Sequence, residues 1–301
     1  MSDSFSDVGL VAVEFHSGGR VAEISRWAIE LGCEVCVADN ASTYCGPGRV
    51  IKPSENLGFG AACNRAVGAL PPAVHIVVLH NPDVHITRDA LEALASVVRD
   101  GELDVVVPTI VGAARRPVGF RYPSAWREPA LSLVDILQLR GQSRGRRAPA
   151  DRGEIDRTGL VHASGRFGTA ALLVLRRSAF EAVGGFDERF FLYGEDLDLW
   201  HRLEVAGFDV GFATHLEAAH AEGQGSTASA ASRTVLRWLS RELFAELHGG
   251  GWRWYRLVHR LMAPFVPDDG AARAMRSAFA RGAAPADAIA SVRWGKTPVG
   301  S

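Results

Sequence analysis

The sequence predicts an α/β fold with a mostly parallel, Rossmann-like sheet that carries helices on both faces. Over the first third of the chain, apolar runs rich in β-branched residues alternate with segments of helical periodicity. The apolar runs end at glycines or at Asp and Asn residues, which are typical of turns. The chain has 301 residues, 47% hydrophobic and 22% charged, which is enough for one large domain or two modest ones.

The elements of the first third follow from these patterns. Gly18 and Gly19 separate the first apolar run from an amphipathic segment, and Thr87 is a suitable N-cap for a later helix. A glycine-rich turn opens the middle helix. Strands are expected at residues 8–15, 33–38, 50–51, 75–80 and 103–107. Helices are expected at residues 21–31, 57–70 and 89–98.

The pattern is less regular after residue 112. Residues 140–152 have no apolar periodicity and are expected to form a mobile loop. Further on, Gly207 ends a helix, and four leucines stand at helical spacing in a C-terminal segment that reads as helical. Strands are expected at residues 169–177 and 210–213, and helices at residues 178–183 and 196–206. The four leucines are Leu236, Leu239, Leu243 and Leu247.

Charge excludes some classes of protein. The net charge of −1 gives no reason to expect nucleic-acid binding. No apolar run approaches the roughly 18 residues of a transmembrane helix, and the polar, acidic start shows no secretory signal, so we expect a cytoplasmic protein. Residues 226–301 hold eleven basic and five acidic residues, a net of +6, while the rest carries −7. This asymmetry indicates a basic C-terminal quarter.

The four cysteines do not indicate a disulfide framework in a chain of this length. Cys33 and Cys36 form a lone C-x-x-C, for which a zinc or redox site is one interpretation. They lie in the strand pattern CEVCVA, and no second Cys pair or suitably spaced His follows. We therefore favour two small apolar residues on a strand.

Two carboxylates follow predicted strands, Asp39 after the second and Asp83 after the fourth. Ligands bind open α/β sheets at the carboxyl ends of their strands. A carboxylate there can accept the imide N–H of a pyrimidine or hold a hard divalent cation, whereas a turn Asp or a helix cap is the simpler interpretation. Between them, residues 56–60 (Asn-Leu-Gly-Phe-Gly) open a helix whose N–H groups suit an anion, although the spacing is not that of a dinucleotide site.

The densest feature lies at residues 184–200, where Glu195, Asp196 and Asp198 mark the start of a helix. One interpretation is purely structural: acidic residues there stabilise the helix by complementing the positive charge at its N-terminus. Alternatively, one of them is a general base that accepts the proton of an attacking hydroxyl. Consecutive residues point in different directions, so at most one or two can face a pocket.

Five segments in this order resemble family 2 glycosyltransferases: ADNAST at 38–43, ENLGFGAACNRAV at 55–67, NPDV at 81–84, RYPSAWREPAL at 121–131, and GGFDERFFLYGEDLDLWHRLEVAGF at 184–208. The resemblance is strongest to bacterial rhamnosyltransferases of the decaprenyl-diphosphate-GlcNAc type and covers residues 8–225. It implies a GT-A fold, a nucleotide-diphosphate sugar donor, Mg2+ or Mn2+, and inverting transfer in one displacement. It also implies a nucleotide-sugar-binding half at 1–110, an acceptor and catalytic half at 111–225, and a C-terminal helical extension at 226–301.

The resemblance also assigns roles to residues. Asp39 would contact the pyrimidine base, Asp83 would be both a donor-site residue and a metal ligand, and His220 would be a second metal ligand near the diphosphate. Asp196 would be the general base, with Glu195 beside it. Further donor contacts would come from Asn56, Gly58 and Asn64. The metal motif reads Asn81-Pro82-Asp83, with one carboxylate where many relatives have two.

The leading interpretation is an inverting transferase that uses dTDP-rhamnose and a lipid-linked or polysaccharide acceptor in cell-envelope glycan synthesis. Another nucleotide sugar with a small natural-product acceptor, or a non-catalytic nucleotide-sugar-binding subunit, remains open, because thymine and uracil offer the same edge to Asp39. In the C-terminal segment an apolar stripe is flanked by Arg253, Arg256 and Arg260. It predicts either peripheral contact with the inner face of the cell membrane or a helix packed on the catalytic domain. The stripe consists of Trp254, Leu257, Val258, Leu261, Met262 and Phe265.

Overall fold

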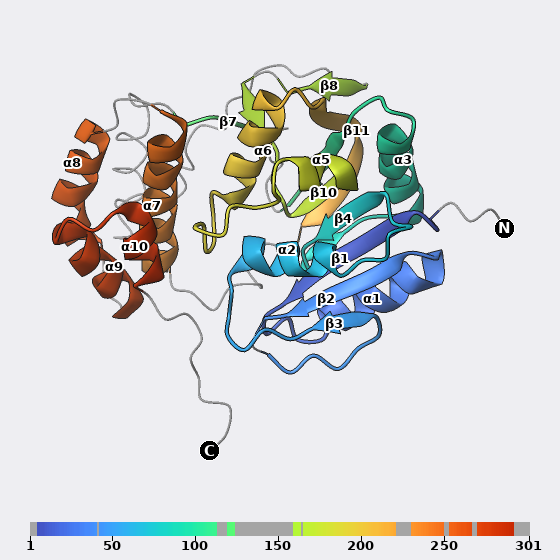
Figure 1. Ribbon diagram of the computed structural model, residues 1–301, viewed down its shortest axis with the longest axis horizontal. Coiled ribbons are helices and arrows are strands. Elements are labelled where there is room, and N and C mark those ends of the chain that lie inside the picture. Colours follow the sequence, from blue (N-terminus) through green and yellow to red (C-terminus); the bar gives the residue numbers. More distant parts are fainter. Residues whose placement is uncertain are drawn as a thin grey trace. The chain divides into compact units, whose positions relative to one another are not determined.

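The structure is a computed structural model that describes residues 5–40, 42–112, 119–123, 159–163, 165–220, 230–249, 253–266 and 270–291 (Figure 1). The loop predicted at residues 140–152 lies outside these ranges. The chain divides into two compact units. The first comprises residues 1–121, 151–187 and 196–226, and the second comprises residues 122–150, 188–195 and 227–301.

The first unit is built on a nine-stranded sheet in the order β3-β2-β1-β4-β10-β6-β11-β5, with β8 paired to β11. Six of these described strands run in one direction, and β10, β5 and β8 run against them, so the prediction of a mostly parallel α/β sheet is confirmed. The strands are β1 (Val8–Glu14), β2 (Glu34–Asp39), β3 (Arg49–Ile51), β4 (Ile76–His80), β5 (Val84–His85), β6 (Val105–Val111), β8 (Leu160–His162), β10 (Leu172–Arg176) and β11 (Val210–His220). A separate pair joins β7 (Phe120–Arg121) to β9 (Arg166–Phe167).

Helices cover both faces of this sheet, as the alternation of side chains along β1 shows. Val8, Leu10 and Ala12 point into the core cluster that holds the buried faces of α1 (Arg20–Leu31) and α3 (Arg88–Arg99). Gly9 points the other way, and a Cβ there would lie 2.8 Å from Leu70, which follows α2 (Phe59–Gly68). Helices α5 (Arg177–Ala182) and α6 (Glu195–Val205) complete this unit.

The predicted signals for the start of one helix and for the end of another are both confirmed. The Thr87 hydroxyl oxygen accepts a hydrogen bond from the backbone N–H of Ala90 at 3.3 Å, which caps α3. Gly207 follows α6 with φ of 84°, a left-handed conformation that glycine adopts without strain.

Two features of the sheet differ from the expected strands. β10 runs antiparallel to both of its neighbours, β4 and β6. This direction was not predicted, because an apolar run indicates a strand but not the direction in which it pairs. β11 continues to His220 although the apolar pattern ends at Ala213, because an irregularity between Ala213 and Glu217 lets pairing with β6 resume. The short strands β5 and β8 were not predicted.

The second unit contains helices that Figure 1 shows gathered in one group. They are α7 (Ala230–His248), α8 (Arg253–Met262) with the 3₁₀ turn η1 (Ala263–Phe265), α9 (Gly270–Ala280) and α10 (Pro285–Ala290). Leu236, Leu239 and Leu243 are buried on α7, as their helical spacing predicts. In the described part of the chain, no helix is both long and apolar enough to cross a membrane.

Candidate active site

The candidate site lies where the strand order of the sheet reverses. β1 pairs with β2 on one side and with β4 on the other, and all three are parallel, so their carboxyl ends share one edge. Asp39 ends β2 opposite Glu14 of β1, and Asp83 follows β4. A crevice at such a reversal is the usual place for a ligand in an open α/β sheet.

Asp39 is almost fully buried, and its carboxylate organises the turn after β2. One oxygen accepts hydrogen bonds from the backbone N–H of Ser42 at 3.0 Å and from its hydroxyl at 2.6 Å. The other oxygen accepts from the N–H of Tyr44 at 3.1 Å and lies 3.7 Å from the ammonium of Lys52. These contacts match a turn Asp, and contact with a nucleobase stays a prediction.

Tyr44 lies in the same turn and is buried. Its hydroxyl donates to the Pro47 carbonyl at 2.9 Å and lies 3.1 Å from the Ser25 hydroxyl. Burial raises the pKa of this phenol, so Tyr44 remains neutral. The turn after Asp39 is therefore held by an aromatic anchor.

An amide pair shapes the glycine-rich turn. The Asn40 side chain donates to Asn56 Oδ1 at 2.7 Å and to the Gly58 carbonyl at 3.0 Å, and it accepts from the N–H of Leu57 at 2.7 Å. Asn56 Oδ1 also accepts from the N–H of Gly58 at 2.9 Å. Gly58 has φ of 82° and is the N-cap of α2, a conformation in which a side chain would be strained.

Asn64 connects α2 to the segment before the acidic helix. Its Nδ2 donates to the Phe186 carbonyl at 2.9 Å, and its Oδ1 accepts from the Phe186 N–H at 2.9 Å. Both ends of the amide are thus bound to the backbone of one residue. The contact of Asn64 with a donor stays a prediction.

Asp83 and His220 are brought together, as the two predicted metal ligands would be. His220 Nε2 lies 3.1 Å from Asp83 Oδ1, and His220 pairs with Val84 across the β5–β11 ladder. Burial raises the pKa of Asp83, but the hydrogen bond and charge of His220 outweigh it, so the pKa lies below its ordinary value. His220 Nδ1 is buried and has no hydrogen-bond partner among the described residues.

These two side chains suit a hard divalent cation that also binds a diphosphate. Among the residues described, no three His, Cys, Asp or Glu side chains form a metal cluster. Mg2+ and Mn2+ are commonly held by one or two protein ligands together with phosphate oxygens. A carboxylate and an imidazole in contact at the sheet edge therefore fit such an ion, with the ligand supplying the remaining oxygens.

His80 underlies this edge. It is fully buried at the end of β4, and burial lowers its pKa to about 4, so it is neutral at physiological pH. Its Nδ1 lies 2.9 Å from the Asn81 carbonyl, so the neutral ring donates there. His80 thereby supports the turn that carries Asp83.

The acidic residues of α6 divide into two roles. Asp198 is completely buried and accepts from Arg202 at 2.8 and 2.7 Å, while Arg202 also donates to the carbonyls of Val183 and Gly185. This ion pair ties α6 to the turn before it. Glu195 is also buried, whereas Asp196 is half-buried and accepts from the N–H of Leu197 at 2.8 Å.

The backbone that leads into α6 is strained. Tyr193 has φ of 68°, which is costly for a residue with a side chain. In the second unit, the guanidinium of Arg237 on α7 lies 6.0 Å from the Tyr193 ring centroid, and burial raises the pKa of this phenol. Gly194 has φ of 87°, and a Cβ there would lie 2.9 Å from Ser240. Helix α7 thus holds the segment that ends at Glu195.

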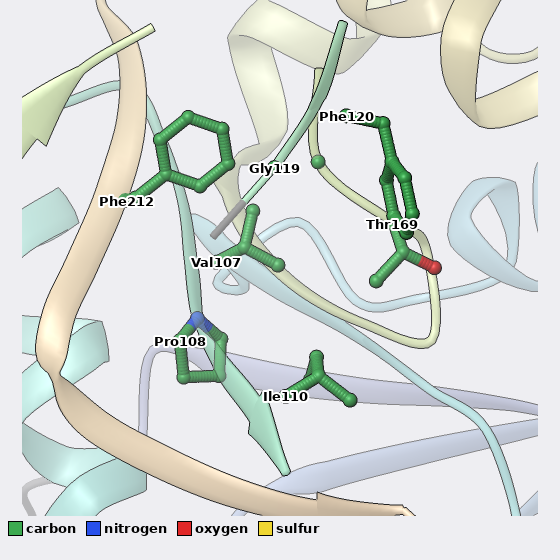
Figure 2. Close-up of a pocket in the computed structure, with 8 residues that line it drawn as sticks. Val107, Pro108, Ile110, Gly119, Phe120, Thr169 and Phe212 are labelled. Carbon is green, nitrogen blue, oxygen red and sulfur yellow. The ribbon is translucent and has the colours of Figure 1, made fainter. Parts of the chain in front are cut away.

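A pocket in the first unit contains none of the predicted site residues (Figure 2). Its walls are apolar except for Thr169, whose hydroxyl oxygen accepts from the N–H of Ala171 at 3.2 Å. A Cβ on Gly168 would lie 2.4 Å from Val107, so this glycine is needed for close approach. The pocket is lined by Val107, Pro108, Ile110, Gly119, Phe120, Gly168, Thr169 and Phe212. It offers apolar contact but no group for proton transfer.

Cys33 and Cys36 are buried in the first unit. Burial raises the pKa of Cys33 to about 12 and that of Cys36 to about 11, so both remain thiols. They behave as small apolar core residues.

Sequence reasoning missed two polar groups at the sheet edge. Asn40 shapes the glycine-rich turn, and its position directly after Asp39 at a strand end was the available signal. Glu14 is buried at the end of β1 and accepts hydrogen bonds from the hydroxyl and, at 2.8 Å, the N–H of Ser17. A carboxylate at the end of an apolar run was the signal there.

Comparisons with known proteins agree with this arrangement. Residues 32–240 match the family model described as "Glycosyltransferase like family 2". The chain is 30% identical over 271 residues to N-acetylglucosaminyl-diphospho-decaprenol L-rhamnosyltransferase of Mycobacterium tuberculosis, covering 81% of this chain and 86% of that protein. It is 31% identical over 186 residues to pre-mycofactocin glycosyltransferase of the same organism, covering 62% of this chain and 33% of that protein.

Two solved structures share the fold. One is S. aureus TarS in complex with UDP, with a TM-score of 0.50, 12% identity, and coverage of 94% of this chain and 89% of that chain. The other is mannosyltransferase PcManGT from Pyrobaculum calidifontis in complex with GDP-Man and Mn2+, with a TM-score of 0.50, 16% identity, and coverage of 95% and 78%. Both are glycosyltransferases of the GT-A fold, and at these identities the likeness shows the fold alone.

Proposed function

The chain belongs to family 2 of the glycosyltransferases, and from that premise we propose that it is an inverting, metal-dependent enzyme that uses a nucleoside-diphosphate sugar. The best candidate for the transferred sugar is L-rhamnose from dTDP-rhamnose. The observation that carries the proposal is the 3.1 Å contact between Asp83 and His220 at the strand-order reversal. The rhamnosyltransferase relative supports the choice of sugar.

The donor would lie along the carboxyl edge of β2, β1 and β4. Asp39 would accept the imide N–H of the base, which requires an oxygen now bound to Ser42 or Tyr44 to share its lone pairs. Asn56 and Gly58 shape the N-terminus of α2, where backbone N–H groups can face an anion. This arrangement suits a pyrimidine nucleotide and leaves thymine and uracil equivalent.

Asp83 and His220 would hold Mg2+ or Mn2+ at the diphosphate. Bound there, the cation would supply charge neutralisation for a nucleoside-diphosphate leaving group. The pKa of Asp83 lies below its ordinary range, so the carboxylate is ionised at neutral pH and can act as a ligand. In the contact with Asp83 the proton lies on Nε2 of His220, so binding of a cation there would require that proton to leave Nε2.

Asp196 is the better of the two candidate bases. Glu195 is buried, whereas Asp196 is partly open to solvent, so an acceptor hydroxyl can reach Asp196. Its carboxylate would take the proton as the hydroxyl attacks the anomeric carbon. Asp198 is committed to Arg202 and is left out of this step.

The acceptor would be a lipid-linked or polysaccharide glycan of the cell envelope, reached from the cytoplasmic side of the membrane. The name of the decaprenol-dependent relative supports a lipid-linked acceptor. The pre-mycofactocin glycosyltransferase supports a second candidate, transfer to a small natural product, although the match covers only a third of that protein. A non-catalytic nucleotide-sugar-binding subunit is a third, and turnover of the donor distinguishes it.

A screen of nucleotide sugars tests the proposal. We expect dTDP-rhamnose to raise the Tm of the protein in Mn2+ or Mg2+ more than in chelator, because ligand that binds only the folded state stabilises it. Incubation with polyprenyl-diphosphate-GlcNAc should then release dTDP. A thermal shift without release on any acceptor would indicate a binding subunit. Turnover of UDP-sugars alone would overturn the choice of donor.

A further inference from the structure

Helix α8 and the turn η1 carry three exposed apolar side chains, which we call the α8 ridge. Leu257 is 57% exposed, Leu261 is 64% exposed and Phe265 is 52% exposed. Leu257 and Leu261 are spaced by four and lie on one side of α8, and Phe265 ends the turn η1 that follows directly. The other large apolar side chains exposed in the described chain, Ile29 and Val205, stand singly on α1 and α6.

The opposite side of α8 is fixed to α7. His259 is buried, and its Nδ1 lies 2.6 Å from Oε1 of Glu242. Its ring stacks on that of Trp238, with ring centroids 4.6 Å apart. Arg256 reaches Glu242 at 3.3 Å and Glu246 at 3.1 Å. Because this polar side is bound to α7, α8 cannot turn the ridge inward without breaking the buried contact between His259 and Glu242.

These contacts correct one part of the predicted membrane-facing stripe. Arg256 is engaged by two carboxylates of α7, so it does not serve as a basic flank of the ridge. Arg260 is exposed on α8 next to Leu261, and Arg273 is exposed on α9. The side chains of residues 253–255, including Trp254, lie outside the described residues.

Charge indicates what covers the ridge. Residues 226–301 carry a net of +6, and Glu242 and Glu246, two of their five acidic residues, face His259 and Arg256. A C-terminal segment of positive net charge that carries an apolar ridge is attracted to anionic lipid headgroups, and two copies of it repel one another. Three side chains are also far fewer than the 20–30 residues a side that a stable protein interface uses, about 800 Å² per partner.

We propose that the α8 ridge inserts into the headgroup region of a bilayer that contains anionic lipids and so holds the enzyme reversibly on the membrane surface. An amphipathic helix of this kind lies in the plane of the interface with its apolar side chains at the acyl boundary. The contacts of α8 with α7 hold α8 in the orientation that keeps the ridge exposed. The inference is independent of the identity of the donor and goes beyond the proposed transfer reaction.

Vesicle co-sedimentation of the full chain tests it. Wild-type protein should sediment with phosphatidylglycerol–phosphatidylcholine vesicles and less with phosphatidylcholine alone, and the difference should shrink at high salt. The triple variant Leu257→Ser, Leu261→Ser, Phe265→Ser should bind about tenfold more weakly, because burial of three large apolar side chains is lost. Val205→Ser, which removes an exposed apolar side chain from α6, is the matched control and should bind as wild type does.

A second variant guards against misfolding of the triple variant. Leu261→Glu changes one exposed position, so it should keep the wild-type Tm and still lose binding to anionic vesicles. Wild-type protein that ignores anionic vesicles at low salt would overturn the proposal, as would ridge variants that bind normally. A wild-type dimer in size-exclusion chromatography that becomes a monomer on Leu261→Glu would assign the ridge to a second copy instead.

Discussion

His220 Nε2 lies 3.1 Å from Asp83 Oδ1, although β11 and the turn after β4 come from distant parts of the sequence. The β5–β11 ladder sets this contact, because it pairs His220 with Val84, the neighbour of Asp83. Two short backbone segments thus create a carboxylate–imidazole pair at the edge where a diphosphate would lie.

The first prediction concerns this pair. Asp83→Ala should weaken donor binding at least tenfold in Mn2+ or Mg2+ but have little effect or a favourable one in chelator, because the bare carboxylate repels a diphosphate. His220→Ala should follow the same pattern more weakly. Calorimetric titration with dTDP-rhamnose under both conditions measures it. Equal losses with metal and with chelator would make Asp83 a structural residue.

The second prediction concerns the base. Asp196→Asn should lower kcat about 10²–10⁴-fold and leave donor affinity unchanged, because the amide cannot accept the proton of the acceptor hydroxyl. Glu195→Gln should have a smaller effect, since its carboxylate is buried. Steady-state kinetics and donor titration measure both. If only Glu195→Gln abolishes transfer, the base is Glu195.

The third prediction concerns the acidic residue that is not expected to be catalytic. Asp198→Asn should destabilise the fold by about 3 kcal/mol, because it leaves Arg202 without its buried carboxylate. Urea unfolding measures it, and Asp209→Asn is the control, since that side chain is 69% exposed. A kcat loss like that of Asp196→Asn with unchanged stability would show that Asp198 takes part in catalysis.

The fourth prediction concerns pH. His80 has a folded-state pKa of about 4 against an ordinary value of 6.5, so between these values the unfolded chain binds a proton that the folded one excludes. Its contribution to stability is present above pH 6.5 and is lost as the pH falls toward 4, by up to about 3 kcal/mol. His80→Asn should therefore flatten the decline of Tm over this window.

Carboxylates titrate in the wild-type protein and in His80→Asn alike, so the difference between their Tm profiles reports the contribution of His80. His215→Asn, at an exposed position on β11, is the control and should keep the wild-type slope. An unchanged slope in His80→Asn would show that another group causes the decline.

The fifth prediction compares two glycines with positive φ. Gly207→Ala meets open space and should cost about 1 kcal/mol from backbone strain alone. Gly194→Ala meets Ser240 at 2.9 Å as well, so it should cost more and displace Glu195 and Asp196, lowering kcat. Unfolding and kinetics measure both. Equal effects of the two substitutions would show that α7 does not hold this segment.

Much of the fold was predictable because local pattern determines it. The strand expected at residues 8–15 and the cap at Thr87 each depend on neighbours in sequence, and both were predicted correctly. The antiparallel placement of β10 was not predictable, because strand direction depends on pairing with β4 and β6. The same holds for the short strand β5, which pairs only through β11.

The sequence names candidate site residues, whose roles stay predictions, but it does not give their contacts. Family resemblance named Asp83 and His220 as metal ligands; the structure places them 3.1 Å apart, and their binding of a metal stays a prediction. The binding of Asn64 to Phe186 and of Arg256 to Glu242 is tertiary, and no spacing in the sequence encodes it. The contact of Asn64 with the donor stays a prediction, whereas Arg256 is engaged by α7 in a way that its position in the sequence did not indicate.

The position of β10 has a consequence for synthesis on the ribosome. β4 and β6 are synthesised before β10 (residues 172–176), the strand that lies between them in the sheet. The edge of β4 and the edge of β6 that pair with β10 therefore stay unpaired until residues 172–176 leave the ribosome. Unpaired apolar edges attract other chains. A fragment that ends at residue 121 should therefore aggregate, and a nascent chain of that length should depend on a chaperone.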